Sequence, residues 1–367
     1  VNPEEQPKEI SGFYILNRGS NGENNSSIHF YDYATSQLSA DIYQKVNNSS
    51  LGESAQQMLI YGSKIYVAVT FSNRLAVLDM DGKLLKTIEP EEGGNTMNPR
   101  CLAADGGKVY MTYFNGHAVA ALDTVSLEIE NKVAVGRYPE ELAVANGKLY
   151  VANSGGNDFP NYGKTVSVVD LSTFKVEKDI EVIINPVSLQ ADSKGDVYVI
   201  SMGNYDDVNN TLQRIDATTG EVKTIGNGSL MKIVNDKLYV VYAQYGKDKP
   251  SLTRYDALTG AVEVESLANI EMMQSPSAIG IDPISGAICI ADGPWNSTAT
   301  LYLFDKEGKI LDLNIDELEV ATPNYDGADM PQFSGFPGQG GYNNDENHDG
   351  KVEGKTADTE DQYLAEF

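Results

Sequence analysis

The sequence predicts an all-β protein, a seven-bladed β-propeller, because one motif occurs seven times along the chain. Each copy has an apolar, β-rich run, a variable loop, a second run that ends in Asp, and a turn. The first runs return every 40 to 52 residues, and six of the seven carry Tyr at the same place. Repeats of this length, with about four strands each, are typical of propeller blades.

Within each blade we expect an innermost strand A, the Tyr-bearing strand B, strand C, and an outer strand D. In the third blade these are residues 100–104, 109–113, 118–123 and 128–135. Short hairpin turns join A to B and C to D, so the B–C and D–A loops share the opposite side of the ring, here called the loop face. Loop length varies mainly on this face, which is typical of a rigid scaffold that carries a binding site.

Two further features repeat from blade to blade and indicate structural roles. A feature present in every blade does not define a unique site, so we interpret the Asp residues that end the second runs as turn caps and not as catalytic carboxylates. Proline directly before strand A costs no ladder hydrogen bond, and four D–A loops end in it. The turn-cap residues are Asp32, Asp79, Asp123, Asp170, Asp216, Asp256 and Asp305. The prolines before strand A are Pro99, Pro139, Pro186 and Pro276.

The chain enters the ring at a B strand, so the first blade needs a strand A from elsewhere. Residues 329–336 repeat the pattern of Pro followed by apolar residues seen in the other A strands. We therefore expect a C-terminal strand to complete the first blade and close the ring. The predicted organisation is an N-terminal linker at 1–10, the propeller at 11–337, and an acidic tail at 338–367.

The composition narrows the function. The chain has 27 Lys plus Arg against 53 Asp plus Glu, a formal charge of −26. A chain this acidic repels phosphate backbones and anionic lipid, which disfavours binding to nucleic acid or to a membrane surface. No apolar run predicts a transmembrane segment. The two cysteines, Cys101 and Cys289, fall in different blades, and we expect both to be free.

Several segments resemble one family of propellers. Residues 149–153, 166–170 and 175–180, followed by Asn185-Pro186, resemble the repeat of the YncE-like, or YVTN, seven-bladed propellers. Residues 153–162 and 301–308 resemble the YncE-like surface lipoproteins of Bacteroidetes, a branch that includes BtuG-type cobalamin-binding proteins.

The resemblance implies a function in uptake. The expected protein is a surface-exposed lipoprotein of the cell outer membrane that captures cobalamin, or a related small molecule, and hands it to a TonB-dependent outer-membrane transporter. It would need no cofactor. Two other classes stay open: a glycan-binding or protein-interaction propeller, and, less favoured, a metal-assisted hydrolase or lyase.

The residues themselves give little support for an enzyme. His29, His117 and His348 lie in unrelated segments, so the sequence assembles neither a Ser–His–Asp triad nor a three-His zinc site. We therefore expect no catalytic residue.

Large aromatic residues are frequent in the predicted loop face, where they stand beside Gly, Asn and Pro. Rigid aromatic groups with Arg and amide neighbours suit a broad ligand, although packing between loops would also explain some of them. One residue near the start of each strand A should line the central channel, as either a ligand contact or a hydrated pore. These channel positions are Gln56, Arg100, Glu140, Val187, Ser229, Ser277 and Gln332. The candidate ligand-binding residues are Arg18, Phe71, Arg74, Arg100, Tyr113, Phe114, Tyr138, Phe159, Tyr162, Tyr205, Tyr242, Tyr245 and Trp295.

The acidic tail contains a candidate calcium loop. Asp345, Asn347 and Asp349 place oxygen ligands at alternate positions, and Gly350 follows where an EF-hand-type loop bends. The twelfth position is Thr356 and not the usual bidentate Glu. A solvated acidic linker would have a similar composition, so both interpretations remain.

Overall fold

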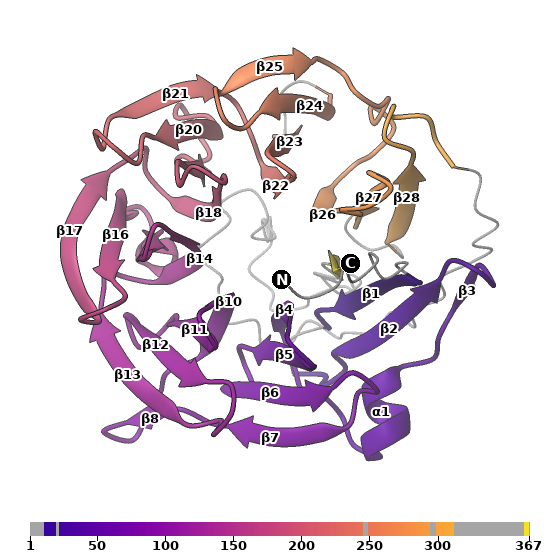
Figure 1. Ribbon diagram of the computed structural model, residues 1–367, viewed down its shortest axis with the longest axis vertical. Coiled ribbons are helices and arrows are strands. Elements are labelled where there is room, and N and C mark those ends of the chain that lie inside the picture. The colour runs from indigo at the N-terminus through magenta and orange to yellow at the C-terminus, as the bar shows by residue number, and fades with distance from the viewer. Residues whose placement is uncertain (1–10, 20–21, 245–248, 294–298, 312–362, 367) are drawn as a thin grey trace, which may run out of the picture.

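The computed structural model describes residues 11–19, 22–244, 249–293 and 299–311, and the backbone of 363–366. Seven antiparallel sheets stand around a central axis, as Figure 1 shows. Six of these sheets have four described strands and the last has three. The predicted all-β, seven-bladed propeller is therefore confirmed.

In blades 2 to 7 the strands run in chain order from the channel to the rim (Figure 1), whereas blade 1 has β29 beside β1. In blades 1 to 3 they are β29 (Tyr363–Glu366), β1 (Gly12–Asn17), β2 (Ser27–Asp32) and β3 (Gln37–Leu38); β4 (Ala55–Tyr61), β5 (Lys64–Val69), β6 (Arg74–Asp79) and β7 (Leu84–Ile88); and β10 (Pro99–Asp105), β11 (Lys108–Tyr113), β12 (Ala118–Asp123) and β13 (Ile129–Ala134).

The remaining four blades repeat the same order. They contain β14 (Pro139–Ala145), β15 (Lys148–Asn153), β16 (Thr165–Asp170) and β17 (Lys175–Glu181); β18 (Pro186–Ala191), β19 (Val197–Ser201), β20 (Thr211–Ile215) and β21 (Val222–Gly226); β22 (Leu230–Val234), β23 (Lys237–Tyr242), β24 (Ser251–Asp256) and β25 (Ala261–Val264); and β26 (Pro276–Ile281), β27 (Ile288–Asp292) and β28 (Thr300–Phe304).

Small elements decorate the connections between blades 1, 2 and 3. Helix α1 (Ile42–Asn47) begins at Asp41, whose carboxylate accepts hydrogen bonds from the backbone N–H groups of Tyr43 and Gln44, as an N-cap does. A small hairpin of β8 (Glu91–Glu92) and β9 (Asn95–Thr96) lies between β7 and β10. Outside these connections, a 3-10 turn, η1 (Gly156–Asp158), lies in the B–C loop of blade 4.

The hydrophobic core lies between blades. One cluster joins Tyr66 and Leu75 of blade 2 to Leu102 and Met111 of blade 3, and each of these side chains is at most 3% exposed. Because each blade buries its faces against its neighbours, the ring folds around a chain of such interfaces.

The two repeated features have the predicted roles. All seven Asp carboxylates accept hydrogen bonds from backbone N–H groups of the following turn, for example from Thr173 to Asp170 at 2.9 Å. The four prolines are the first residues of β10, β14, β18 and β26. The A–B turn at Gly106 and Gly107 has positive φ at both residues, 57° and 78°, which a two-residue hairpin of this kind requires.

Strand β1 has a neighbour on its channel side. Strand β29 pairs with it in antiparallel register, with Tyr14 opposite Glu366 and Asn17 opposite Tyr363. The segment 329–336, which was expected to supply this strand, lies outside the described residues. Cys101 and Cys289 are both free, as predicted.

Candidate ligand-binding site on the loop face

A polar trio stands at the channel side of three consecutive blades. Gln56, Arg100 and Glu140 are the second residues of β4, β10 and β14. Each of these strands has a register shift at its start, a bulge that changes the direction of a side chain there. Arg100 forms an ion pair with Glu140 through Nε and donates from Nη1 to the side-chain oxygen of Gln56 at 3.4 Å.

The Arg100–Glu140 pair is shielded from water. Its side chains are only 14% and 11% exposed, so their attraction is weakened less by solvent than that of a surface pair. Ser154, in the B–C loop of blade 4, also lies within 3.5 Å of Glu140 through its hydroxyl oxygen. These contacts hold one cation and one anion in fixed positions beside the channel.

Aromatic rings continue from Arg100 along the loop face. The guanidinium carbon of Arg100 lies 4.4 Å from the centroid of the Phe114 ring, a cation–π contact. The Phe114 and Tyr138 centroids are 5.1 Å apart, and His117 packs edge-on against Tyr138 at 4.7 Å. This group comes from the B–C loop of blade 3 and the D–A loop that leads into blade 4.

Tyr138 has an unusual backbone conformation. Its φ is 47°, in the left-handed region, where its counterparts before the prolines of β10 and β18 are Asn98 and Asn185. Asn tolerates this region well, whereas a bulky residue there costs about 1–2 kcal/mol. His117, which packs against Tyr138, and Tyr205, which packs against Tyr162, also have positive φ, 48° and 59°. Backbone strain of this kind gathers at functional sites.

A second aromatic group continues into blade 5. The ring centroids of Phe159 and Tyr162 are 6.0 Å apart, and those of Tyr162 and Tyr205 are 6.2 Å apart. Asn185 donates its side-chain N–H to the Tyr205 hydroxyl at 3.4 Å. Phe159 is 49% exposed, so it presents a large apolar surface to solvent.

The two tyrosines of this group are neutral at physiological pH. Burial raises the pKa of Tyr162 to about 12. Burial also raises the pKa of Tyr205, with the nearby Tyr162 and Glu140 adding to the effect. The buried hydroxyl of Tyr162 has no hydrogen-bond partner among the described residues. A buried polar group without a partner is rare, and an unseen water or ligand atom is one explanation for it.

The long B–C loop of blade 4 is fastened in place. Arg137 forms an ion pair with Asp158 and donates to the carbonyl of Asn161 at 3.0 Å. The hydroxyl of Ser154 donates to the carbonyl of Tyr138 at 2.9 Å. The site is therefore held before any ligand arrives. We call it the aromatic arc, defined as Arg100, Phe114, Tyr138, Phe159, Tyr162 and Tyr205.

The aromatic arc contains six of the candidates expected from the sequence. The other described candidates lie elsewhere. Tyr113 is 2% exposed in the core between blades 2 and 3, and Arg18 is 5% exposed. Arg74 holds two D–A loops, because it donates to the carbonyl of Leu51 at 3.2 Å and lies 3.6 Å from the carboxylate of Glu89.

Two candidates are half-buried, and the rest fall outside the described part of the chain. Phe71 lies in the B–C loop of blade 2, and the Tyr242 hydroxyl at the end of β23 donates to the side chain of Gln244 at 3.3 Å. Tyr245, Trp295 and Gln332 fall outside the described residues, as do the candidate calcium ligands Asp345, Asn347 and Asp349. In the described ranges, no group of three or more His, Cys, Asp or Glu residues is arranged to hold a metal ion.

Sequence reasoning missed His117, Ser154 and Asn185. His117 accepts a hydrogen bond from the backbone N–H of Tyr138 at Nδ1, 3.0 Å away. Burial and the nearby Arg137 lower the pKa of His117, so the imidazole is neutral at pH 7. The only signal in the sequence was the Tyr before Pro139, at a position where two other blades have Asn.

The fold and site define a seven-bladed propeller with a polar and aromatic face at blades 2 to 5. Residues 11–230 match the family described as a domain of unknown function, DUF5074. The chain therefore belongs to this family. No curated protein matches the chain. None of the helices in the described part has the length and apolar character that crossing a membrane requires.

Solved structures with the same fold differ widely from this chain in sequence. A quinoprotein alcohol dehydrogenase-like protein of Bacteroides thetaiotaomicron has 15% identity and a TM-score of 0.60, over 82% of this chain and 74% of that one. A putative 6-phosphogluconolactonase of Bacteroides fragilis has 12% identity and a TM-score of 0.58, over 84% and 96%. A functionally unknown protein of Desulfotomaculum acetoxidans has 12% identity and a TM-score of 0.59, over 82% and 94%. At these identities the likeness concerns the fold alone.

Proposed function

We propose that this chain is a binding protein that holds a small molecule on its loop face, with cobalamin as the leading ligand. The observation that carries the proposal is the aromatic arc, which consists of two groups of contacting rings and one shielded ion pair on blades 3 to 5. The ligand would pass to a TonB-dependent outer-membrane transporter, and the protein would be a lipoprotein of the outer-membrane surface. These last two steps rest on the resemblance to YncE-like lipoproteins.

The chemistry of the aromatic arc suits a broad ligand with polar edges. Phe159, 49% exposed, and the half-buried Tyr138 and Tyr205 offer apolar surface to a flat ring system, whereas Phe114 and Tyr162 are themselves buried. Arg100, Gln56 and Glu140 offer donors and acceptors, which the amide side chains of a corrin ring also carry. Because the loops are already fastened, little conformational entropy would be lost on binding.

The hydrogen bonding of His117 and the pKa values of two tyrosines near the site favour binding over catalysis. His117 is the obvious general base near the aromatic arc, yet its Nδ1 already accepts the N–H of Tyr138. The Tyr162 and Tyr205 phenols have raised pKa values, so they do not act as anions near neutral pH. We therefore propose that the loop face binds its ligand without making or breaking a bond.

Glycan binding is the second candidate. The exposed ring of Phe159 beside the backbone and amide groups of its loop would also suit stacking against a sugar. A glycan would engage the exposed ring and leave the shielded Arg100–Glu140 pair out of the contact, whereas a corrin with amide arms would use both.

Calorimetric titration with cyanocobalamin tests the proposal. We expect one-to-one binding by the wild-type chain, weakened about 5- to 30-fold in Phe159→Ala, since loss of an aromatic contact costs about 1–2 kcal/mol. Tyr242→Ala is the matched control, because it removes a half-buried aromatic residue from the loop face of blade 6. Repeating the titration with calcium tests the loop at residues 345–349.

Three outcomes would contradict the proposal. No heat at micromolar protein in either buffer would overturn the cobalamin assignment. Equal losses in Phe159→Ala and Tyr242→Ala would move the site away from the aromatic arc. Binding of a polysaccharide on an affinity gel, abolished by Phe159→Ala, would favour the glycan.

A further inference from the structure

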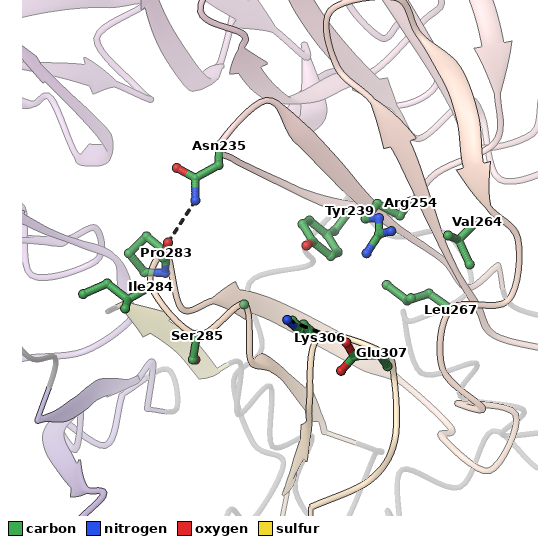
Figure 2. Close-up of a pocket in the computed structure, with 11 residues that line it drawn as sticks. Asn235, Tyr239, Arg254, Val264, Leu267, Pro283, Ile284, Ser285, Lys306 and Glu307 are labelled. Carbon is green, nitrogen blue, oxygen red and sulfur yellow. Dashed lines mark hydrogen bonds and ion pairs between the residues drawn. The ribbon is translucent and has the colours of Figure 1, made fainter.

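A cavity opens on the side of the ring opposite the loop face. It lies between blades 6 and 7, where the A–B turns of both blades and the C–D turn of blade 7 meet β23 and β24 (Figure 2). Its volume is about 550 Å³, within the range of small-molecule sites. The lining residues used below are Tyr239, Arg254, Val264, Leu267, Ile284 and Lys306. We call this cavity the hairpin-face pocket.

The preceding blade has the same pair of residues with its polar groups occupied. Tyr198 and Arg214 stand opposite each other on β19 and β20, as Tyr239 and Arg254 do on β23 and β24. The Tyr198 hydroxyl donates to the carbonyl of Ala257 at 2.5 Å. Arg214 donates to the carbonyls of Leu258 and Thr259 at 3.0 and 2.9 Å. The C–D turn of blade 6 thus occupies the polar groups of blade 5.

The equivalent groups of blade 6 are not occupied in this way. Arg254 has one contact within the described part of the chain, from Nε to the carboxylate of Glu263 at 3.1 Å. The hydroxyl of Tyr239 makes no hydrogen bond to any described residue. The C–D turn of blade 7 instead brings Lys306 and Glu307 to the cavity wall (Figure 2). The two Nη groups of Arg254 and the Tyr239 phenol therefore remain available to a ligand.

The charge pattern also changes between the two blades. Asp196, two residues before Tyr198, pairs with Arg214. The residue two before Tyr239 is Lys237, which shares the carboxylate of Glu263 with Arg254. Lys306 adds a further cation, 3.8 Å from the exposed carboxylate of Glu307. Lys237 also stands opposite Asp256, so three cations and three carboxylates meet here, in a chain whose formal charge is −26.

We infer that the hairpin-face pocket binds a small organic anion, an oxyanion attached to an apolar group. The Nη groups of Arg254 and the hydroxyl of Tyr239 supply hydrogen bonds to the oxyanion, and a planar guanidinium suits a carboxylate or phosphate. Lys306 supplies further positive charge. Val264 and Leu267 give the apolar group a surface, and Ile284, 57% exposed, stands at the rim. This site is separate from the aromatic arc and does not depend on its function.

Ligand-observed saturation-transfer NMR on the full chain tests the inference with phenyl phosphate and benzoate. Benzyl alcohol, which has the ring without the charge, is the control probe. We expect both anions to bind and benzyl alcohol to bind at least fivefold more weakly, a difference of about 1 kcal/mol. Whichever anion binds more tightly identifies the oxyanion as phosphate or carboxylate. Raising the salt concentration should weaken both anions, because it screens the cations.

Substitutions at the exposed rim keep the test independent of folding. Ile284→Glu should weaken the anions at least fivefold, whereas Ile284→Lys should retain or strengthen binding. Arg254→Gln should weaken anion binding as Ile284→Glu does. The control Lys309→Gln, which removes an exposed lysine outside the pocket, should have no effect on anion binding. Phe159→Ala should also leave these probes unaffected.

The inference is wrong if neither anion binds at about 10 mM, a concentration at which even a millimolar site fills. Equal binding of benzyl alcohol would also overturn it, as would equal behaviour of Ile284→Glu and Ile284→Lys. Weakening by Phe159→Ala but not by Arg254→Gln would place the anions on the loop face.

Discussion

Removing the carboxylate of Glu140 should destabilise the fold measurably. Breaking a fully buried ion pair costs about 3–5 kcal/mol, because one charge is left without a partner. Arg100 keeps some access to water, at 14% exposure, and retains Gln56 and the ring of Phe114. We therefore expect Glu140→Ala to lower the free energy of unfolding by about 2 kcal/mol, below the fully buried range.

Urea unfolding followed by circular dichroism measures this change. Glu140→Gln keeps an acceptor for Arg100 without the charge, so it should cost less, about 1 kcal/mol. The double variant Arg100→Met with Glu140→Leu should also cost less than Glu140→Ala, since neither charge is then left alone. A change of under about 0.5 kcal/mol in Glu140→Ala, the range of an exposed pair, would refute the argument that this pair is shielded.

Two other predictions concern Glu141, in β14, and Tyr138, directly before β14. Glu141 accepts hydrogen bonds from the backbone N–H of Leu189 at 2.8 Å and from Gln190 at 3.1 Å, and burial raises its pKa above the ordinary 4.5. The folded state therefore holds the proton more tightly, and stability is lost as the pH rises from about 4.5 through the raised pKa. Glu141→Gln should gain stability relative to wild type between pH 4 and pH 7 in urea unfolding, and parallel pH profiles would contradict this. Tyr138→Asn should change the free energy of unfolding by less than about 1 kcal/mol, because relief of backbone strain offsets the lost ring contacts. It should still weaken cyanocobalamin binding, and a loss of stability above about 3 kcal/mol would show that Tyr138 is mainly structural.

The repeat made the fold predictable. A motif that returns seven times fixes the number of blades, and the Asp and Pro positions fix the turns and the starts of the inner strands. These features depend on local turn chemistry, which the sequence carries directly. The source of the strand beside β1 was harder to predict, because a strand that joins a blade from far along the chain needs only a short apolar pattern. Strand β29 lies inside the predicted acidic tail.

The site was only partly predictable because contacts across blades depend on register. Phe114 and Tyr138 are both visible as loop aromatics, but nothing in the sequence shows that their rings meet at 5.1 Å beside Arg100. The same reasoning placed Tyr113 among the ligand contacts, although it points into the core, 2% exposed, one residue before Phe114. Phe114, just after the end of β11, is buried as well, at 6%, and only its contacts with Arg100 and Tyr138 distinguish it from Tyr113.

Both binding sites that we propose lie where the chain departs from the repeat. Where three D–A loops place a left-handed residue before proline, two use Asn and one uses Tyr138, and the Tyr stands in the aromatic arc. Among the described strands, only blades 5 and 6 pair this Tyr with Arg across the B and C strands, where blades 2 to 4 have Val or Ala, and the pair of blade 6 lines a cavity. A residue that satisfies the repeat needs only a structural reason. Tyr138 breaks the repeat at some cost to stability, and it lies in the aromatic arc that we propose to hold a ligand.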